Sequence, residues 1–138
     1  MATFQIDVVS AEHKLFSGEA TGLFITTTEG SMGILPGHQP LLAALDIAGA
    51  HIDLGDGSRQ HVAVHRGYVY YSGGDTAVIL ADIAELAQEI DVEEERKHLM
   101  KLERMRADEV DHLDLELPAM VRMAETRIAV AEKANGKS

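Results

Sequence analysis

The spacing of the apolar residues changes near Asp82, and this change limits most strongly what the 138-residue chain can fold into. Before Asp82, apolar and polar residues alternate, as they do from Phe4 to Val8. After it, no glycine occurs until Gly136, and the strong helix formers Ala, Glu, Leu, Met, Lys and Arg dominate. Alternation indicates strands, and glycine-free stretches of helix formers indicate helices. We therefore predict a β domain over residues 1–86 and a helical part over residues 87–138.

Short runs with a period of two recur through the first part of the chain. Turn signals separate them, and they stand at Ser17-Gly18, Glu29-Gly30, Pro36-Gly37, Gly55-Asp56-Gly57 and Gly73-Gly74-Asp75. Many short strands with frequent turns and no helical spacers are typical of an antiparallel sandwich or barrel. The residues alone do not choose between these two architectures.

Two amphipathic helices are expected in the second part, at about residues 91–107 and 117–134. Asp91 is placed to cap the first helix, with Glu94 three residues later, and Pro118 is tolerated only in a first turn. The second helix has the clearer apolar face: Leu117, Met120, Val121, Ala124, Ile128 and Ala131. In the first helix Glu103 interrupts the face, and the acidic stretch 108–114 is interpreted as a turn. Together these features predict an antiparallel helical hairpin.

Charge and composition exclude several classes of partner. The formal net charge is −11 and the pI is about 4.9, which argues against nucleic acid and against adsorption to anionic lipid. The chain has no cysteine, and its longest apolar runs are far shorter than the roughly 20 residues that span a bilayer. No signal or transit peptide is recognisable at the N-terminus. We expect no nucleic-acid partner and no direct membrane insertion.

Residues that carry chemistry do not group into a recognisable catalytic or metal-binding pattern. His61 and His65 are four residues apart, but on a strand this separates them by about 13 Å, too far to share a metal ion. No nucleophile elbow or phosphate loop is present. The prediction is therefore a protein without catalytic residues, cofactor or metal. A small β-domain enzyme or metal-binding protein is kept only as a remote alternative.

The stretch Glu29-Gly30-Ser31-Met32-Gly33-Ile34-Leu35-Pro36-Gly37-His38-Gln39-Pro40-Leu41-Leu42 is the most distinctive in the sequence. Its three glycines and two prolines impose a convoluted backbone in a region otherwise rich in strands. Two interpretations remain open. The stretch is a structurally demanding loop, or it is a rigid loop presented to a protein partner.

This stretch resembles the pattern EGxxGxxPGHxPLL of the epsilon subunit of F-type ATP synthases. Four further segments are similar to that family: residues 7–12, 15–19, 64–70 and 80–91. The resemblance covers about residues 3–92, and helices of the expected kind and order follow. It implies a ten-stranded β-sandwich, which would resolve the choice between sandwich and barrel.

The resemblance also implies a function in the central stalk of a rotary motor. The β domain would bind the gamma subunit and the ring of c subunits, coupling proton transport to ATP synthesis. The partner-binding residues carried over from the pattern are Glu29, Ser31, Met32, Pro36, Gly37, His38 and Pro40. Family members often have an acidic residue where this chain has Ser31. The implied location is the cytoplasmic face of a bacterial cell membrane, as a peripheral subunit, with the plastid thylakoid as the other option.

By the same resemblance, the hairpin would fold onto the β domain or extend toward the catalytic alpha and beta subunits and inhibit ATP hydrolysis. A basic face suits such contacts, and its members are Lys97, Lys101, Arg104, Arg122 and Lys133. The alternative is an ordinary solvated face. Some family members bind ATP through an [IL]-D-x-x-R-A pattern; here Glu94 stands in place of the arginine, so nucleotide binding is not expected.

One further interpretation has the same architecture but another role. An unrelated adaptor could combine a β-sandwich with a partner-binding helical hairpin, and the residues outside the family pattern do not separate these two. Co-purification with the gamma subunit would do so.

Overall fold

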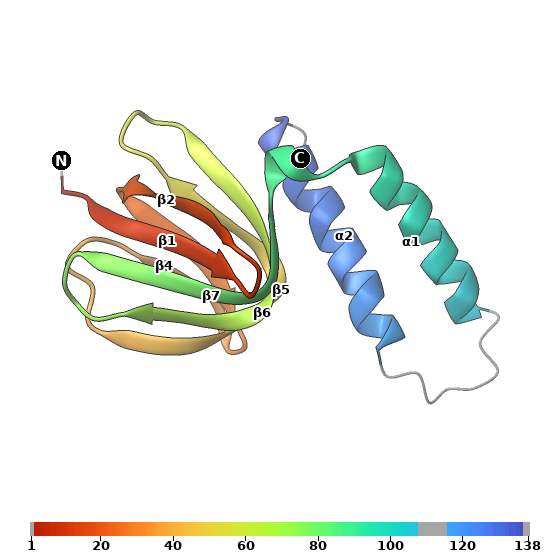
Figure 1. Cartoon of the computed structure of the whole chain (residues 1–138), viewed down its shortest axis with the longest axis horizontal. Helices are drawn as coiled ribbons and strands as arrows, with labels where there is room; N and C mark the ends of the chain where they lie inside the picture. The colour runs from red at the N-terminus through yellow and green to blue at the C-terminus, as the bar shows by residue number, and fades with distance from the viewer. Residues whose placement is uncertain (1, 108–115, 137–138) are drawn as a thin grey trace.

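The computed structural model describes residues 2–107 and 116–136 and has the two parts that the change of period predicts (Figure 1). Seven strands come first: β1 Phe4–Ser10, β2 Lys14–Ala20, β3 Gly22–Thr27, β4 Gly30–Ile34, β5 Leu41–Asp53, β6 Arg59–Tyr71 and β7 Thr76–Leu86. A short 3-10 helix, η1 (Ala87–Glu89), then leads to the helices α1 (Val92–Ala107) and α2 (Leu117–Ala134).

All seven strands belong to one hydrogen-bonded sheet with the order β2-β1-β7-β6-β5-β3-β4. Every neighbouring pair is antiparallel except β1 and β7, which run parallel from Gln5↔Thr76 to Ser10↔Ala81. The predicted antiparallel sheet is therefore correct for all pairs but this one. The first strand, β1, therefore pairs with the last strand, β7, and this pairing joins the two ends of the β domain.

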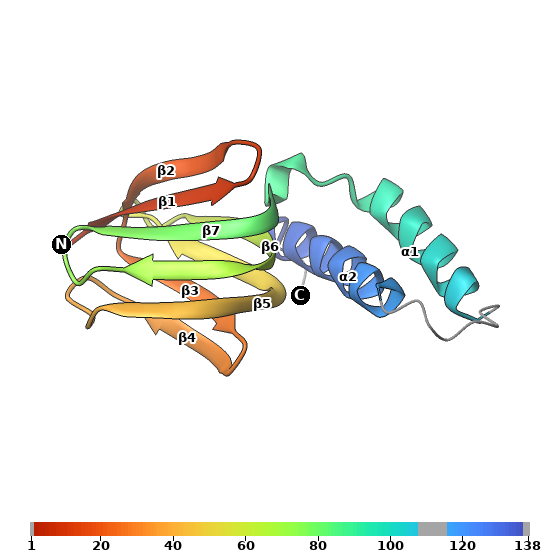
Figure 2. The same cartoon turned by 60° about the horizontal axis from the view of Figure 1, so that its bottom comes forward.

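The sheet folds over on itself to enclose a single core. Every strand contributes buried apolar side chains to one cluster, among them Ile6, Leu23, Ile34, Ile52, Val69 and Ile79. A flat sheet could not bring side chains from strands at opposite edges into one cluster, because neighbouring strands are about 4.8 Å apart. The sheet is thus a β-sandwich, and its two layers are visible when Figures 1 and 2 are compared.

The three long strands bend where Arg66 lies opposite Asp46 and Asp82. The pairing of β6 with both neighbours skips this residue, and Arg66 has a positive φ of 65°. The register is the same on both sides of Arg66, so no residue is inserted, and the inward-facing positions change at the two positive-φ residues Arg66 and Gly67. Accordingly, Val69 and Tyr71 face the core on one side of Arg66, and Val62 and Val64 face it on the other.

The bend explains why the expected number of about ten short strands became seven. Strands β5, β6 and β7 each pass through the bend and so contribute one segment to each layer. Gly67 makes the bend possible: its φ is 137°, and a Cβ there would collide with the carbonyl oxygen of Leu80. Turn signals marked loops well, but a bend inside a continuous strand has no such signal.

The helical hairpin is as predicted over the residues that the structure describes. The backbone N–H of Glu94 donates to Oδ1 of Asp91 at 3.2 Å, so Asp91 caps α1. The helices pack through Leu102, Leu117, Val121 and Ala124, with Leu99 half-buried beside them. Glu103 is exposed and therefore does not disturb this contact. The predicted turn at 108–114 lies outside the described residues.

Helix α2 is the element that contacts the sandwich, and α1 packs on α2 (Figures 1 and 2). The helix crosses the outer face of β5 and β6 near residues 46–51 and 61–65. Met120, one of the apolar residues predicted for its buried face, is 39 % exposed.

Candidate functional surfaces

The glycine- and proline-rich stretch is not one loop. Residues Gly30–Ile34 form the edge strand β4, and Leu41 already begins β5. The expected convoluted loop over 29–42 is therefore corrected to a β3–β4 turn, an edge strand and a short connection at 35–40. The pattern was misread because glycine at edge strands and turns looks the same in sequence as glycine in a loop.

The β3–β4 turn holds Glu29 and Ser31 at the surface. Thr27 Oγ1 donates to the carbonyl oxygen of Gly30 at 2.9 Å and accepts the N–H of Glu29 at 3.1 Å. Gly30 has a φ of 129°, which favours glycine. Met32 is half-buried against the core. Among the predicted partner residues of this turn, Glu29 and Ser31 are therefore exposed, whereas Met32 is mainly a packing residue.

The connection 35–40 is tied to the core by one fully buried side chain. The hydroxyl of Tyr71 accepts the N–H of Gly37 at 3.3 Å and donates to the carbonyl oxygen of Gly74 at 2.8 Å. Gly73 lies so close to Pro40 that a Cβ there would be 2.9 Å from its ring. The second group of predicted partner residues, Pro36, Gly37, His38 and Pro40, thus sits on a preformed end of the sandwich. That end faces away from the helices (Figure 1).

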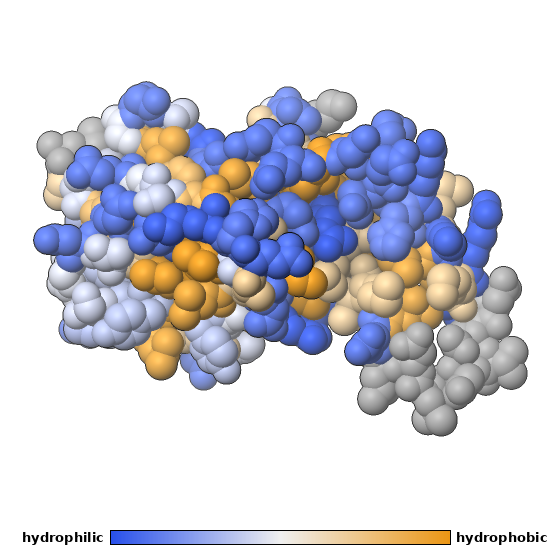
Figure 3. All heavy atoms as spheres, viewed as in Figure 1, coloured by the Kyte–Doolittle hydropathy of each residue, from blue (hydrophilic) through white to orange (hydrophobic). Residues whose placement is uncertain are grey.

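An apolar patch adjoins this end, and the sequence prediction missed it. It consists of Leu42, Tyr68, Tyr70 and Leu80, which are 69, 55, 49 and 53 % exposed. They come from three neighbouring strands, because Leu42 pairs with Tyr70 and Tyr68 with Leu80. We call these four residues the outer patch. On the face shown in Figure 3, orange apolar residues lie among hydrophilic ones on the sandwich.

The outer patch could have been found from the alternation in β6. Val69 and Tyr71 are the inward positions, so Tyr68 and Tyr70 must point outward, where large apolar side chains are unusual when clustered. Aromatic residues on an outward face are typical of protein–protein contacts. The signal was present, but only the three-dimensional sheet puts Leu42 and Leu80 beside them.

The hairpin contacts the sandwich through a small apolar seat. Val130 of α2 packs with Ala63 of β6 and Ala87 of η1, and Ile90 covers them partly. Gly49 pairs with Ala63 across β5 and β6, and a Cβ at Gly49 would be only 2.8 Å from Val130 Cγ2. The strands therefore offer a hollow of small residues into which one valine side chain fits.

A polar junction lies beside this seat and links strands with helices. Glu85 of β7 accepts from His65 Nε2 at 2.7 Å and from Arg127 Nε at 3.1 Å. Arg127 also lies 3.7 Å from Oε2 of Glu95 on α1. His65 is almost fully buried, and its Nδ1 has no hydrogen-bond partner. Burial raises the pKa of Glu85, but the hydrogen bonds from His65 and Arg127 outweigh it and leave that pKa below the ordinary value of 4.5.

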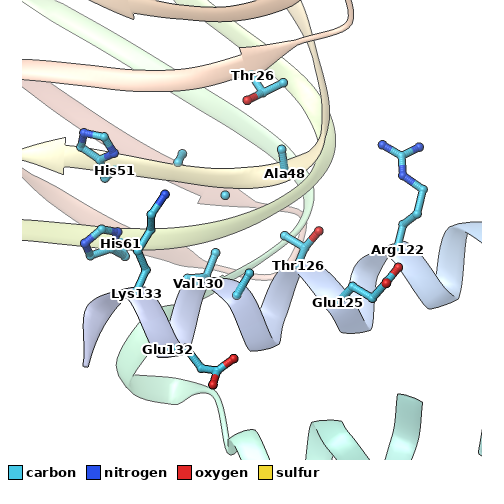
Figure 4. A pocket seen from close by; sticks show the side chains of 13 residues that line it. Thr26, Ala48, His51, His61, Arg122, Glu125, Thr126, Val130, Glu132 and Lys133 are labelled. Carbon is cyan, nitrogen blue, oxygen red and sulfur yellow. The ribbon is translucent and has the colours of Figure 1, made fainter. Parts of the chain in front are cut away.

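A groove of about 640 Å³ follows α2 where it crosses β5 and β6 (Figure 4). Small residues form its floor, and Lys133, His51 and His61 lie near one end. Burial lowers the pKa of both histidines, with Arg59 and Lys133 adding to the effect. The two rings are 5.7 Å apart, and His51 stacks on Phe24 at 4.7 Å. The lowered pKa favours the neutral form of both rings, which pack at this end of the groove.

The five basic residues predicted for the hairpin do not share one face. Lys97, Lys101 and Arg104 are exposed on α1. Arg122 instead donates to Oδ1 of Asp46 in β5 at 3.0 Å, and Lys133 lines the groove described above. All five side chains are exposed, but Arg122 and Lys133 lie along the sandwich, whereas Lys97, Lys101 and Arg104 lie on α1.

A second groove lies where the nucleotide-binding pattern of the first helix would be. It is lined by Glu85, Glu89, Asp91, Glu94, Glu95 and Arg127, with Ile90 and His98. Its one arginine already lies against two carboxylates. Five carboxylates line this groove, and their negative charge is unfavourable for a phosphate group.

Two further properties concern the part of the chain that the structure describes. Over residues 2–107 and 116–136, no group of three or more His, Asp or Glu side chains is placed to hold a metal ion. Neither described helix is both long and apolar enough to cross a membrane.

Sequence comparison identifies the sandwich directly. The family model for "ATP synthase, Delta/Epsilon chain, beta-sandwich domain" matches residues 3–87. The ATP synthase epsilon chain of Streptomyces griseus is 41 % identical over 98 residues, which are 71 % of this chain and 78 % of that protein. The epsilon chain of Streptomyces coelicolor is 34 % identical over 126 residues, covering 91 % of this chain and 98 % of its own length.

Solved structures share the whole architecture, helices included. A chain of the Euglena gracilis mitochondrial ATP synthase (OSCP/F1/c-ring) superposes with a TM-score of 0.70 at 20 % identity and covers 99 % of this chain and 81 % of its own. A chain of the Tetrahymena thermophila mitochondrial ATP synthase central stalk and c-ring gives 0.55 at 14 % identity, with 96 % of both chains covered. At these identities the likeness shows the fold alone. The sequence matches go further: this chain belongs to the epsilon-chain family of ATP synthases.

Proposed function

We propose that the chain is a non-catalytic rotor subunit in the central stalk of an F-type ATP synthase. The sandwich binds the gamma subunit and the loops of the c-ring, and so helps to couple proton transport to ATP synthesis. The subunit lies at the cytoplasmic face of the bacterial membrane as a peripheral component. The observation that carries the proposal is the outer patch next to the preformed 35–40 connection, within a domain that matches the family model.

The chemistry of this surface suits a permanent protein partner. Two tyrosines and two leucines stand on adjacent strands, and a rigid sheet presents them without an ordering cost. Apolar and aromatic centres of this kind supply most of the energy of stable interfaces. We assign the outer patch to gamma, and the exposed turn at Glu29 and Ser31 to the c-ring loops.

The hairpin is proposed to inhibit ATP hydrolysis when it leaves the sandwich and extends toward the catalytic alpha and beta subunits. Lys97, Lys101 and Arg104 are exposed and can meet acidic partner segments, although Lys97 lies 3.8 Å from Glu94 in the docked hairpin. Met100 and Met105 are exposed among them at 57 and 48 %. A flexible apolar side chain beside positive charge suits a surface that changes partners.

The test is reconstitution with gamma and the catalytic subunits. Leu42→Glu places a charge in the outer patch, and gamma binding should weaken at least about tenfold, since one buried anchor is worth more than about 1.4 kcal/mol. Met100→Glu is the matched control, because it changes another exposed apolar residue, one that lies on the hairpin. Unchanged gamma binding in Leu42→Glu would refute the assignment of the outer patch.

Truncation after Ile90 tests the role of the hairpin. The shortened chain should still assemble with gamma, and ATPase activity should rise because the inhibitory element is gone. Failure to assemble, with a folded sandwich shown by circular dichroism, would contradict the division of roles.

A further inference from the structure

The contact between the hairpin and the sandwich is narrow. Its apolar part consists of Val130, Ala63 and Ala87 with half-buried Ile90, whereas the sandwich core draws on all seven strands. Three buried side chains, two of them alanines, remove little apolar surface from water. The docked position of the hairpin therefore depends on the polar contacts between α2 and the strands as well as on this apolar seat.

We propose that Glu85 and Arg127 form a latch that holds the hairpin on the sandwich, with Gly49 as the seat that admits Val130. Substitutions at Glu85, Arg127 or Gly49 should then change the fraction of molecules in which the hairpin is docked. The biological consequence, control of hydrolysis, rests on the proposed function, but the docking equilibrium itself is a property of this chain alone.

Glu85 is the centre of the latch because it joins elements from both parts. His65 reaches it from β6, Arg127 from α2, and Glu95 of α1 shares the same arginine. The contact with Arg127 is sheltered: the side chains of Arg127 and Glu85 are 17 and 24 % exposed. Undocking would remove the arginine partner of Glu85 and leave it with His65 alone.

The second ion pair across the boundary provides an internal comparison. Arg122 and Asp46 are bonded at 3.0 Å, but their side chains are 50 and 38 % exposed. Exposed pairs contribute under about 1 kcal/mol, a factor of about five or less. Charge-assisted bonds away from solvent contribute about 1.5–3 kcal/mol, a factor of about 10–100. The two arginines of one helix are thus predicted to differ clearly.

Gly49 allows the seat to be tested without touching the latch. A Cβ there meets Val130 Cγ2 and no other atom within 4 Å, and its φ lies outside the left-handed region. Valine at this position suits a strand and leaves the sandwich unstrained. Gly49→Val should therefore push α2 away while the β domain stays folded.

The experiment measures docking by distance, in a chain that has no native cysteine. Spin labels on Ser58→Cys in the β5–β6 turn and Lys101→Cys on α1 report the separation of sandwich and hairpin by pulsed electron resonance. We expect one short distance in the wild type. Arg127→Gln and Glu85→Gln should each shift the docked-to-undocked ratio by about 10–100-fold.

Two comparisons decide the outcome. Arg122→Gln should shift the ratio fivefold at most, and Gly49→Val should give the long distance with an unchanged sandwich unfolding transition. The latch is overturned if Arg127→Gln and Arg122→Gln behave alike. The double variant Glu85→Gln/Arg127→Gln should be no more undocked than either single one, because the two share one contact.

The result also separates this inference from the proposed inhibition. If Arg127→Gln undocks the hairpin but ATP hydrolysis by the reconstituted complex does not change, the latch stands and the inhibitory role fails. If docking is unaffected, the latch fails whatever the hydrolysis rate.

Discussion

The sandwich and the hairpin differ strongly in how many apolar side chains they bury. The sandwich collects side chains from seven strands into one core, including fully buried Tyr71, Ile6 and Ile79. The hairpin buries Leu102, Leu117, Val121 and Ala124 and rests on the sandwich through Val130 and a few polar contacts. One part is stable enough to serve as a platform. The other depends on its surroundings, which is the property that a movable element requires.

The two parts should unfold separately, and a core substitution gives the largest effect. Ile79→Ala should lower the free energy of unfolding of the sandwich by about 2–5 kcal/mol, since it opens a cavity in the main core. Leu102→Ala should instead melt the helices and leave the sandwich transition in place. Urea unfolding followed in parallel by two probes measures this.

The chain supplies a selective probe for each part. Its three tyrosines, Tyr68, Tyr70 and Tyr71, all lie in β6, and it has no tryptophan, so tyrosine fluorescence reports the sandwich. The far-ultraviolet helical signal reports the hairpin. If both probes moved together in both variants, the molecule would be one cooperative unit and the comparison would be wrong.

A smaller effect is expected from acid. The pKa of Glu85 is lower in the docked state than its ordinary value of 4.5. The hydrogen bond from His65 lies within the sandwich, so docking adds only the share of this lowering that comes from Arg127. That share stabilises docking fully above the undocked pKa of Glu85 and is lost as the pH falls through the lower, docked pKa. The side chains that face Glu85 are those of His65 and Arg127, with Glu95 beyond the arginine.

The label distance measured during acid titration checks this. The hairpin should leave the sandwich before the tyrosine signal of the sandwich changes. In Glu85→Gln, which has no carboxyl at this position, the docked fraction should vary much less over the same range. An equal response of both proteins would assign the acid effect to other carboxylates, such as Asp46 at the Arg122 contact.

The smallest effect is expected from added nucleotide, which should not bind to the chain. Calorimetric titration with Mg-ATP should show no binding, because the groove at the start of α1 is lined by five carboxylates and its arginine is already engaged. Glu94→Arg, which restores the arginine of the family pattern, is the comparison that isolates the charge at this position. Micromolar binding by the unaltered chain would contradict the prediction.

Much of this molecule could be predicted because the relevant signals are local. Alternation in Phe4–Val8 and the helical spacing of Leu117, Val121 and Ala124 identify elements, and Asp91 marks the start of α1 from its own neighbours. The candidate site was predicted less well. The sequence predicts partner residues in the 29–40 stretch but also a single loop there, where the structure has a turn, an edge strand and a connection. It does not predict the outer patch, because the members of that patch come from three strands.

By itself, the sequence determined the two parts, their order and their secondary structure, since periodicity and caps act over a few residues. Only the tertiary structure decided where the long strands bend at Arg66, that Val130 enters the hollow at Gly49, and that Arg127 meets Glu85. Each of these brings together residues far apart in the chain. Their approach depends on packing of the whole sheet, which no local pattern encodes. The contact between sandwich and hairpin, which includes the proposed latch of Glu85 and Arg127, is therefore a property of the tertiary structure.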